Sequence, residues 1–408
     1  MRVRPPLDNR TKVLYHRDMH IHTAPDTITK LAKMADATHF EPAGDSPQTE
    51  RPQSRRREQY QSRSLAECIT NVSTPKGKKP ILKSMLTTAC ERNCNYCPFR
   101  AGRARTERIT ITPDQMAKAF DELARARQVE GMFLSSGIIK GSVTTQDKLL
   151  DTVEIVRQKY RYRGYVHLKV MPGAEYDQLY RAMQLADRVS VNLEAPSSER
   201  MAALAPKKHF ERELLDLLIA AEKIRRDHPH QKLARTVTQF VVGAVGDTDL
   251  ELLSLSSRLY RQANLARAYY SAFEPVIQTP LENVSATHPK REFRLYQSSF
   301  LLRDYLWEVE ELPFMQDGNL DLNLDPKRAW ADAHLVHAPV EINTAERTQL
   351  MRIPGIGPKG ADAIIRARAK ATIAELNQLR KLGIAAPDQA ANYVLLNGKR
   401  PPAQLSLL

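Results

Sequence analysis

The sequence contains little cysteine, with four residues among 408. Three of them, Cys90, Cys94 and Cys97, lie within eight positions, and Cys68 stands apart. Disulfide frameworks need bridges spread along a chain, so this distribution argues against one and favours a reducing, cytoplasmic environment. Long apolar runs are missing as well, because no stretch approaches the roughly 18 residues of a membrane span. The N-terminus carries arginines but no apolar signal core, so we do not expect export.

Acidic residues are also scarce relative to basic ones. The chain has 61 Lys and Arg against 47 Asp and Glu, a net charge of +14 and a pI near 9.6. Clustered basic side chains gain affinity for phosphates by displacing counterions, so this balance favours a polyanionic partner, although a solvated charge excess would give the same totals. The length and a hydrophobic content of 42% predict one large domain plus a smaller one.

The texture of the sequence changes near Pro80. Residues 1–78 are rich in Pro, Arg, Ser and Gln and predict an irregular basic arm with one short helix near residues 29–37. Beyond Pro80, six short apolar runs alternate with amphipathic stretches. The runs are ILKSMLTTA, GMFLSS, VHLKVMP, RVSVNLEA, RTVTQFVVG and RAYYSAFEP. In the first amphipathic stretch, Thr112 and Gln115 form a capping box that predicts a helix.

Repeated strand and helix units indicate a fold class. Crossovers of this length imply a parallel sheet with right-handed connections, and six units suit an α/β fold with a partial (β/α)6 barrel of the TIM type over residues 79–282. Residues 283–338 predict a helical connecting region. Residues 339–408 predict a small all-α domain. In such barrels the chemistry lies at the C-terminal ends of the strands.

Cys90, Cys94 and Cys97 follow the first predicted strand directly, which places three thiolates on the catalytic rim. Three thiolates can hold three irons of a [4Fe-4S] cluster and leave the fourth iron open. A closed zinc site wants four ligands, and the only other cysteine, Cys68, lies 22 positions away. Zinc binding and simple packing cysteines remain the alternatives to the cluster.

The spacing Cys-x-x-x-Cys-x-x-Cys, with Tyr96 before the last cysteine, resembles the signature of the radical S-adenosylmethionine (SAM) superfamily. The resemblance implies a [4Fe-4S] cluster whose open iron binds SAM. It also implies reductive cleavage of SAM to a 5′-deoxyadenosyl radical that abstracts hydrogen from a substrate. Tyr96 would then lie at the cofactor.

The same resemblance implies further SAM contacts after later strands, each with a structural alternative. Ser135, Ser136 and Gly137 occupy the position of the usual Gly-Gly-Glu, so the contact to the amino group is altered here. Asn192 and Glu194 in the fourth run alternate with apolar neighbours, which puts both on one face. Similar polar residues contact the ribose or sulfonium in relatives, and a solvated or hydrogen-bonded pair is the alternative. The turn that contains Gly243 and Gly246 would let the backbone approach the adenine, or would serve only as a turn and helix cap.

The C-terminal segment IPGIGPKGADAI resembles a helix-hairpin-helix, a sequence-nonspecific binder of the DNA backbone. Its predicted contact residues are Gly355, Ile356, Gly357 and Lys359. Glycines allow a close approach, and free amides at a helix start bind phosphate. Residues 340–408 contain 10 Lys or Arg and 5 Asp or Glu, which fits phosphate contact, although a helical turn used for protein contact is the alternative. Residues 373–392 resemble a degenerate second pair of helices.

Taken together, residues 28–384 resemble the family of DNA modification or repair radical SAM proteins. The segments YQSSFLLRDY, LDPKRAWADAH and PVEINTAERTQLMRIPGIG carry this resemblance with the cysteine loop, whereas ATHFEPAGDSPQTERPQ departs from it. The resemblance implies duplex DNA as the partner, a protein partner related to uracil-DNA glycosylases, and an electron donor such as flavodoxin or ferredoxin.

Cys68 is the only thiol outside the cluster motif, so a second cysteine-held cluster cannot be built. It is a candidate hydrogen donor that quenches a product radical, with an inert buried cysteine or a donor tyrosine as alternatives. The leading hypothesis is a radical enzyme that modifies or repairs DNA. A radical enzyme acting on structured RNA, and a noncatalytic DNA-binding protein that senses redox state, are the competing hypotheses.

Overall fold

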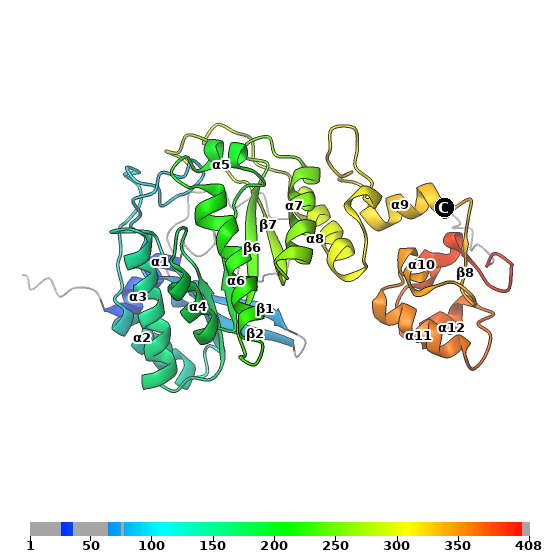
Figure 1. Cartoon of the computed structure of the whole chain (residues 1–408), viewed down its shortest axis with the longest axis horizontal. Coiled ribbons are helices and arrows are strands. Elements are labelled where there is room, and N and C mark those ends of the chain that lie inside the picture. The colour runs from blue at the N-terminus through cyan, green and yellow to red at the C-terminus, as the bar shows by residue number, and fades with distance from the viewer. Residues whose placement is uncertain (1–25, 36–63, 75–76, 402–408) are drawn as a thin grey trace, which may run out of the picture.

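The computed structural model describes residues 26–35, 64–74 and 77–401. Its centre is a seven-stranded sheet in the sequential order β1 to β7 (Figure 1). The strands are β1 (Ile69–Thr74), β2 (Gly77–Met85), β3 (Gly131–Ser135), β4 (Tyr165–Lys169), β5 (Arg188–Ser190), β6 (Arg235–Val242) and β7 (Arg267–Ala272). Strands β2 to β7 are parallel and correspond to the six apolar runs, so the predicted partial barrel is confirmed.

Helices connect the parallel strands and cover the outer face of the sheet (Figure 1). They are α2 (Pro113–Arg125), α3 (Ser142–Glu154), α4 (Tyr176–Leu185), α5 (Ser198–Leu204), α6 (Asp216–Asp227), α7 (Asp249–Gln262) and α8 (Pro289–Asp304). Helix α2 begins with the expected capping box of Thr112 and Gln115. None of the helices in the described part of the chain is long and apolar enough to cross a membrane.

Alternate strand residues face opposite sides of the sheet. Leu134 and Leu168 lie in the main core under the helices, whereas Phe133 and Tyr165 lie in a small cluster on the other face. This alternation is the ordinary consequence of the pleat. Because both faces of the strands are packed, the loops at the strand ends are where functional residues can lie.

The end of the N-terminal region differs from the irregular arm that the sequence predicts. Helix α1 (Thr27–Met34) matches the expected short helix and packs Leu31 and Met34 into the core. Residues 65–68 form a 3-10 turn, and β1 pairs antiparallel with β2. Strand β1 was missed because its sequence, ITNVST, is short and mostly polar.

The C-terminal module has its own core, built from α9 (Pro326–His334), α10 (Arg347–Arg352), α11 (Pro358–Arg368) and α12 (Leu376–Lys381). A short parallel pair of strands, β8 (Val340–Glu341) and β9 (Val394–Leu395), joins its two ends. In Figure 1 the module lies beyond α8, connected through α9. The C-terminal helices thus share one hydrophobic core, to which α9 contributes, and the domain boundary at residue 339 stays a prediction.

The module is fastened to the barrel domain through Arg352. One guanidinium nitrogen donates to both carboxylate oxygens of Glu311, at 2.6 and 2.8 Å. The guanidinium also lies 4.6 Å from the ring centroid of Trp307 and 5.9 Å from that of Trp330. The two tryptophan rings are 5.3 Å apart, and they are the only tryptophans in the sequence.

We expect Arg352→Ala to loosen this docking, because it leaves the Glu311 carboxylate without its partner and removes the cation from the two rings. The loss should be on the order of 2 kcal/mol. Intrinsic fluorescence during denaturant unfolding measures it directly, since both tryptophans report from the contact. The matched control is Arg328→Ala, whose exposed 3.7 Å pair with Asp332 should contribute little. Equal midpoints for the two variants would contradict the docking role.

Candidate active site and nucleic-acid interface

The cysteine loop leaves β2 and runs alongside the segment that leaves β3. Backbone hydrogen bonds join the two, from Leu86 N to Ser135 O at 2.9 Å, from Gly137 N to Thr87 O at 2.8 Å and from Glu91 N to Ile138 O at 2.8 Å. The loop is thus held by main-chain pairing, in the way that a strand would be. This pairing fixes the first cysteine, Cys90, at the C-terminal edge of the sheet.

Gly137 makes this close approach possible. A Cβ atom at this position would lie 2.2 Å from the carbonyl oxygen of Ala89 and 3.1 Å from that of Thr87. Backbone atoms cannot move aside as a flexible side chain can, so any larger residue would push the two segments apart. Ser135 and Ser136 beside it are buried, and the Ser136 hydroxyl donates to the carbonyl of Gly137 at 2.7 Å.

The three loop cysteines meet the requirements of cluster ligands. Cys94 is buried, whereas Cys90 and Cys97 are partly exposed, and none forms a disulfide. Backbone amides already point at two sulfurs, with Ile138 N 3.5 Å from Cys90 Sγ and Phe99 N 3.4 Å from Cys97 Sγ. Such bonds stabilise thiolates and tune cluster potentials.

The donor set at this loop consists of three thiolates. Among the described residues, no group of three His, Cys, Asp or Glu side chains is arranged to hold a metal ion. Each thiolate of a [4Fe-4S] cluster binds a different iron, so three cysteines at this spacing suit such a cluster.

A buried ion pair lies beside this loop. Lys208 Nζ is 3.1 Å from Glu194 Oε1, and the two side chains are 9% and 7% exposed. Burial and the negative charge of Glu194 raise the pKa of Tyr96 well above its ordinary value. Sequence reasoning predicted Tyr96 and Glu194 but missed Lys208, because its place depends on the short loop after α5 that packs onto the cysteine loop.

The electrostatics of the loop without its cluster follow from burial. Burial raises the pKa of the Cys94 thiol, and Lys208 partly opposes that rise. The pKa of Cys97 is raised by burial and by the neighbouring Cys94. Burial by itself would lower the pKa of Lys208, but Glu194 and the Cys94 thiol hold it above its ordinary value. The Lys208 ammonium is therefore a buried positive charge beside the Cys94 thiol.

Asn192 and Glu194 lie just beyond β5, but they do not act as one polar face. The Asn192 amide donates to the side chain of Gln239 at 2.8 Å, which ties it to β6. Glu194 has a left-handed backbone with φ of 62° and is bridged to β6, since its N donates to Gln239 O and its O accepts from Val241 N, both at 2.8 Å. That backbone turns its side chain toward Lys208.

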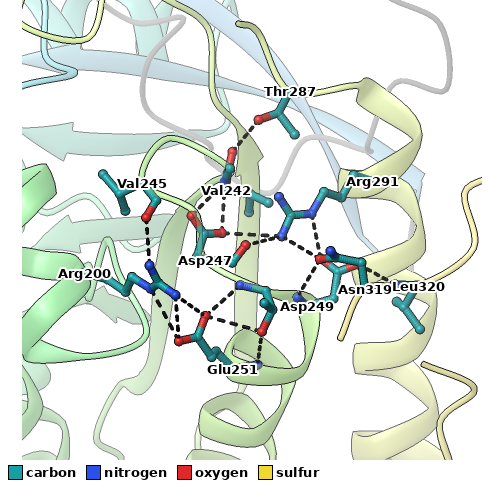
Figure 2. A network of polar contacts seen from close by, with 12 residues as sticks. Arg200, Val242, Val245, Asp247, Asp249, Glu251, Thr287, Arg291, Asn319 and Leu320 are labelled. Atoms are coloured by element: carbon teal, nitrogen blue, oxygen red, sulfur yellow. Dashed lines mark hydrogen bonds and ion pairs between the residues drawn. The ribbon is translucent and has the colours of Figure 1, made fainter. Parts of the chain in front are cut away.

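The glycine turn after β6 belongs to a polar network that Figure 2 shows. Both Gly243 and Gly246 have positive φ, and the Gly243 amide donates to the carboxylate of Asp247 at 2.9 and 3.0 Å. Arg291 of α8 bonds to the carbonyl of Asp247 at 2.7 Å and to the carboxylate of Asp249 at 2.7 Å. The network fastens the turn to α7 and α8, as the turn-and-cap alternative expects. A contact of these glycines with adenine stays a prediction.

Cys68 lies away from the solvent, in the core beside α1. Its side chain is 0% exposed, and its thiol donates to the carbonyl of Leu31 at 3.2 Å. Cys68 is therefore buried, and its role as a hydrogen donor stays a prediction.

The predicted hairpin lies between α10 and α11. Gly355 has φ of 84°, Ile356 is fully buried, and Lys359 is exposed in the first turn of α11. Gly357 precedes Pro358, the first residue of the helix, and a Cβ on it would lie 3.0 Å from the hydroxyl of Tyr305.

The hairpin is also held by α9. Lys327 Nζ donates to the carbonyl of Ile356 at 2.5 Å and lies 4.8 Å from the ring centroid of Tyr305. Burial lowers the pKa of Lys327 to about 7. These contacts fix the hairpin relative to α8 and leave the exposed Lys359 at the start of α11.

Two family models match separate parts of the chain. The model of the radical SAM superfamily matches residues 84–255, and that of the helix-hairpin-helix motif matches residues 337–395. No curated protein gives a significant match.

Three solved structures are similar at low identity. The [FeFe]-hydrogenase maturase HydG from Carboxydothermus hydrogenoformans is 15% identical with a TM-score of 0.43, covering 54% of this chain and 50% of that one. Methylornithine synthase (PylB) is 14% identical with a TM-score of 0.43, covering 54% and 60%. The cobalamin-dependent SAM radical enzyme OxsB is 12% identical with a TM-score of 0.34, covering 74% and 46%. This chain thus spans about half the length of these proteins.

The partial parallel barrel carries a three-cysteine loop at its rim. Residues 84–255 form a radical SAM domain, and members of that superfamily are enzymes that use a [4Fe-4S] cluster and SAM. When bound, the reduced cluster supplies the electron that cleaves SAM to a carbon radical. Residues 337–395 carry the helix-hairpin-helix motif, a motif that suggests nucleic-acid binding.

We expect Gly137→Ala to reduce cluster incorporation several-fold, because the new methyl group displaces the backbone on which Cys90 is mounted. The measurement is iron and sulfide per chain after anaerobic reconstitution. Gly360→Ala is the control, since a Cβ there meets only isoleucine side chains, the nearest atom at 3.2 Å. A Gly137→Ala protein that loads as much iron as the control would show that the close approach is dispensable.

Proposed function

We propose that this radical SAM enzyme acts on DNA, in modification or repair. The observation that carries the proposal is the helix-hairpin-helix motif, which lies on the same chain as the cysteine loop and is joined by Arg352 to Glu311 of the connecting region. The net charge of +14 supports a polyanionic substrate. A base acted on within a duplex would first have to leave the stack.

The chain's own residues divide the work of the site. Cys90, Cys94 and Cys97 would hold the cluster, and the polar groups around them would hold SAM. The proposed SAM contacts are Tyr96, Ser135, Ser136, Gly137, Asn192, Glu194, Gly243 and Gly246. Burial of Cys94 and the closely paired backbone support this division, because they exclude water from a site that generates a reactive radical.

The nucleic-acid contact would use the hairpin at Gly355, Ile356 and Gly357, with Lys359 beside it. Amides at the start of α11 and the Lys359 ammonium suit a phosphate, and such contacts carry no sequence information. A partner related to uracil-DNA glycosylases, an electron donor such as flavodoxin or ferredoxin, and a cytoplasmic location complete the proposal.

The same contacts would tolerate structured RNA, which is therefore the second candidate substrate. The module has a separate core and binds phosphate rather than a base edge, so nothing in its motif selects deoxyribose. A noncatalytic redox-sensing DNA binder is the third candidate. It requires a cluster that binds DNA and never cleaves SAM.

The first test is release of 5′-deoxyadenosine by the anaerobically reconstituted, reduced protein. We expect release that duplex DNA stimulates more than structured RNA does, and we expect Cys94→Ala to abolish it, since the third iron then has no thiolate. Cys68→Ala is the matched control, because that thiol lies in the core beside α1. Greater stimulation by RNA would select the second candidate, and a loaded wild-type cluster without any release would select the third.

The second test concerns the hairpin. We expect Lys359→Ala to weaken duplex DNA binding by several-fold at low salt and to lower the slope of log affinity against log salt by about one, because one phosphate contact is lost. Lys223→Ala, an exposed lysine on α6, is the control with the same charge change. Identical slopes for the two variants would remove Lys359 from the interface.

A further inference from the structure

The chain that follows the last cysteine of the loop carries an excess of basic residues. Residues 100–108, which we call the arginine segment, read RAGRARTER and contain four arginines and one glutamate. That glutamate, Glu107, forms an ion pair with Lys33 of α1 at 2.8 Å. Arg105 and Arg108 are exposed. Since a lysine already balances the Glu107 carboxylate, the exposed arginines have to find their partners elsewhere.

The arginine segment lies across the open side of the barrel. The first and last parallel strands, β2 and β7, are not paired with each other, so the described sheet does not close. Arg103 Nε donates to Ile277 O, in the loop after β7, at 2.9 Å. The Arg105 amide donates to Gln278 Oε1 of the same loop at 3.4 Å. The segment therefore belongs to the rim at the C-terminal ends of the strands, a few residues from Cys97.

The Arg108 guanidinium is held by main-chain carbonyls and not by carboxylates. It donates to the carbonyls of Thr88, Phe99 and Arg100, each at 2.8 Å. Within the part of the chain that the structure describes, neither Arg105 nor Arg108 forms an ion pair. Carbonyl oxygens orient a guanidinium but carry no net charge, so the positive charge stays on the rim.

Arginines elsewhere on the barrel do have acidic partners. Arg157 lies 3.0 Å from the carboxylate of Asp187, and Arg200 lies 3.4 Å from that of Glu251. Like charges that gather without acids repel one another and disfavour the compact state. A bound anion would relieve this repulsion, so the arginine segment suits an anionic ligand.

Arg105 is the arginine that the fold itself does not explain. Among the described residues, its backbone amide makes a hydrogen bond and its exposed guanidinium makes none. Arg108, by contrast, fastens the loop through three carbonyls. The Arg105 guanidinium is therefore available to a ligand, and its planar fork of N–H donors matches the oxygens of a phosphate.

An apolar side chain beside the arginines favours a nucleotide over a free phosphate ion. The side chain of Ile277, whose carbonyl accepts from Arg103, is 41% exposed at the same rim. A base that has left the stack packs on apolar side chains, while its flanking phosphates need cations. Inorganic phosphate would use the cations alone.

We propose that the arginine segment binds the DNA phosphates beside the reacting nucleotide, with Arg105 in direct contact with one of them. The hairpin at Lys359 then provides one contact, and the segment provides a second contact at the cysteine loop. The inference rests on the proposed function, because it takes DNA as the substrate. It adds a surface that does not belong to the helix-hairpin-helix module.

The test is duplex DNA binding by the anaerobically reconstituted full chain over a series of salt concentrations. We expect Arg105→Ala to weaken binding several-fold at low salt and to lower the slope of log affinity against log salt by about one, because one phosphate contact is lost. Arg105→Lys should retain the wild-type slope, since it keeps the charge. Arg163→Ala is the matched control, because Arg163 is exposed just before β4, at the opposite end of the barrel.

The double variant Arg105→Ala with Lys359→Ala separates the two contacts. It should lower the slope by about two, because distant contacts act additively. The two single variants should also differ at saturating DNA. Arg105→Ala should lower the maximal stimulation of 5′-deoxyadenosine release, since only the segment positions the nucleotide at the cysteine loop. Lys359→Ala should raise the DNA concentration needed and leave the maximum in place. All variants are compared at matched iron content.

Two results would overturn the inference and leave the proposed function standing. One is an Arg105→Ala protein whose affinity and slope equal those of Arg163→Ala. The other is a double variant that loses no more than Lys359→Ala alone. A wild-type chain that binds no duplex DNA at low salt would instead contradict the proposed function, and the inference with it.

Discussion

The approach of two backbones at Gly137 is the constraint on which the rest of the site depends. The cysteine loop pairs with the segment after β3 through main-chain hydrogen bonds. Only glycine fits at position 137, because a Cβ atom there would lie 2.2 Å from the carbonyl oxygen of Ala89. Every later contact builds on that loop. The loop that carries Lys208 is bonded to it, Glu194 faces Lys208, and β6 holds Glu194 in its strained backbone. The cysteine loop, the loop that carries Lys208 and the barrel rim thus support one another.

The cysteine loop and its neighbours also bring buried charges together. A cluster held by three thiolates is anionic, and anions in a poorly solvated site need a nearby cation. Lys208 supplies it, and Glu194 keeps the lysine from leaving an excess positive charge when no ligand is present. The polar network of Figure 2 repeats this logic on the far side of the rim, where Arg291 bonds to Asp247 and Asp249 and ties the turn after β6 to α8.

The sequence was sufficient for the features that depend on local pattern. Each of the six apolar runs became a parallel strand, Thr112 capped its helix, and the two glycines marked the hairpin. Strand β1 was not predicted because an edge strand needs few apolar residues, and ITNVST contains only two. Lys208 escaped because its role comes from a loop that folds back over more than a hundred residues onto Asn95. Periodicity carries no trace of such contacts.

The docking of the C-terminal module fixes the distance between the hairpin and the cysteine loop. Arg352 and Lys327 fasten the hairpin to the connecting region on the barrel side, so the span from the hairpin to the cysteine loop is set by folded protein and not by a flexible tether. A nucleic-acid strand bound as proposed at the hairpin would therefore be held at a fixed distance from the cysteine loop. Its reacting nucleotide would then be selected by position along the strand, counted from the bound phosphate.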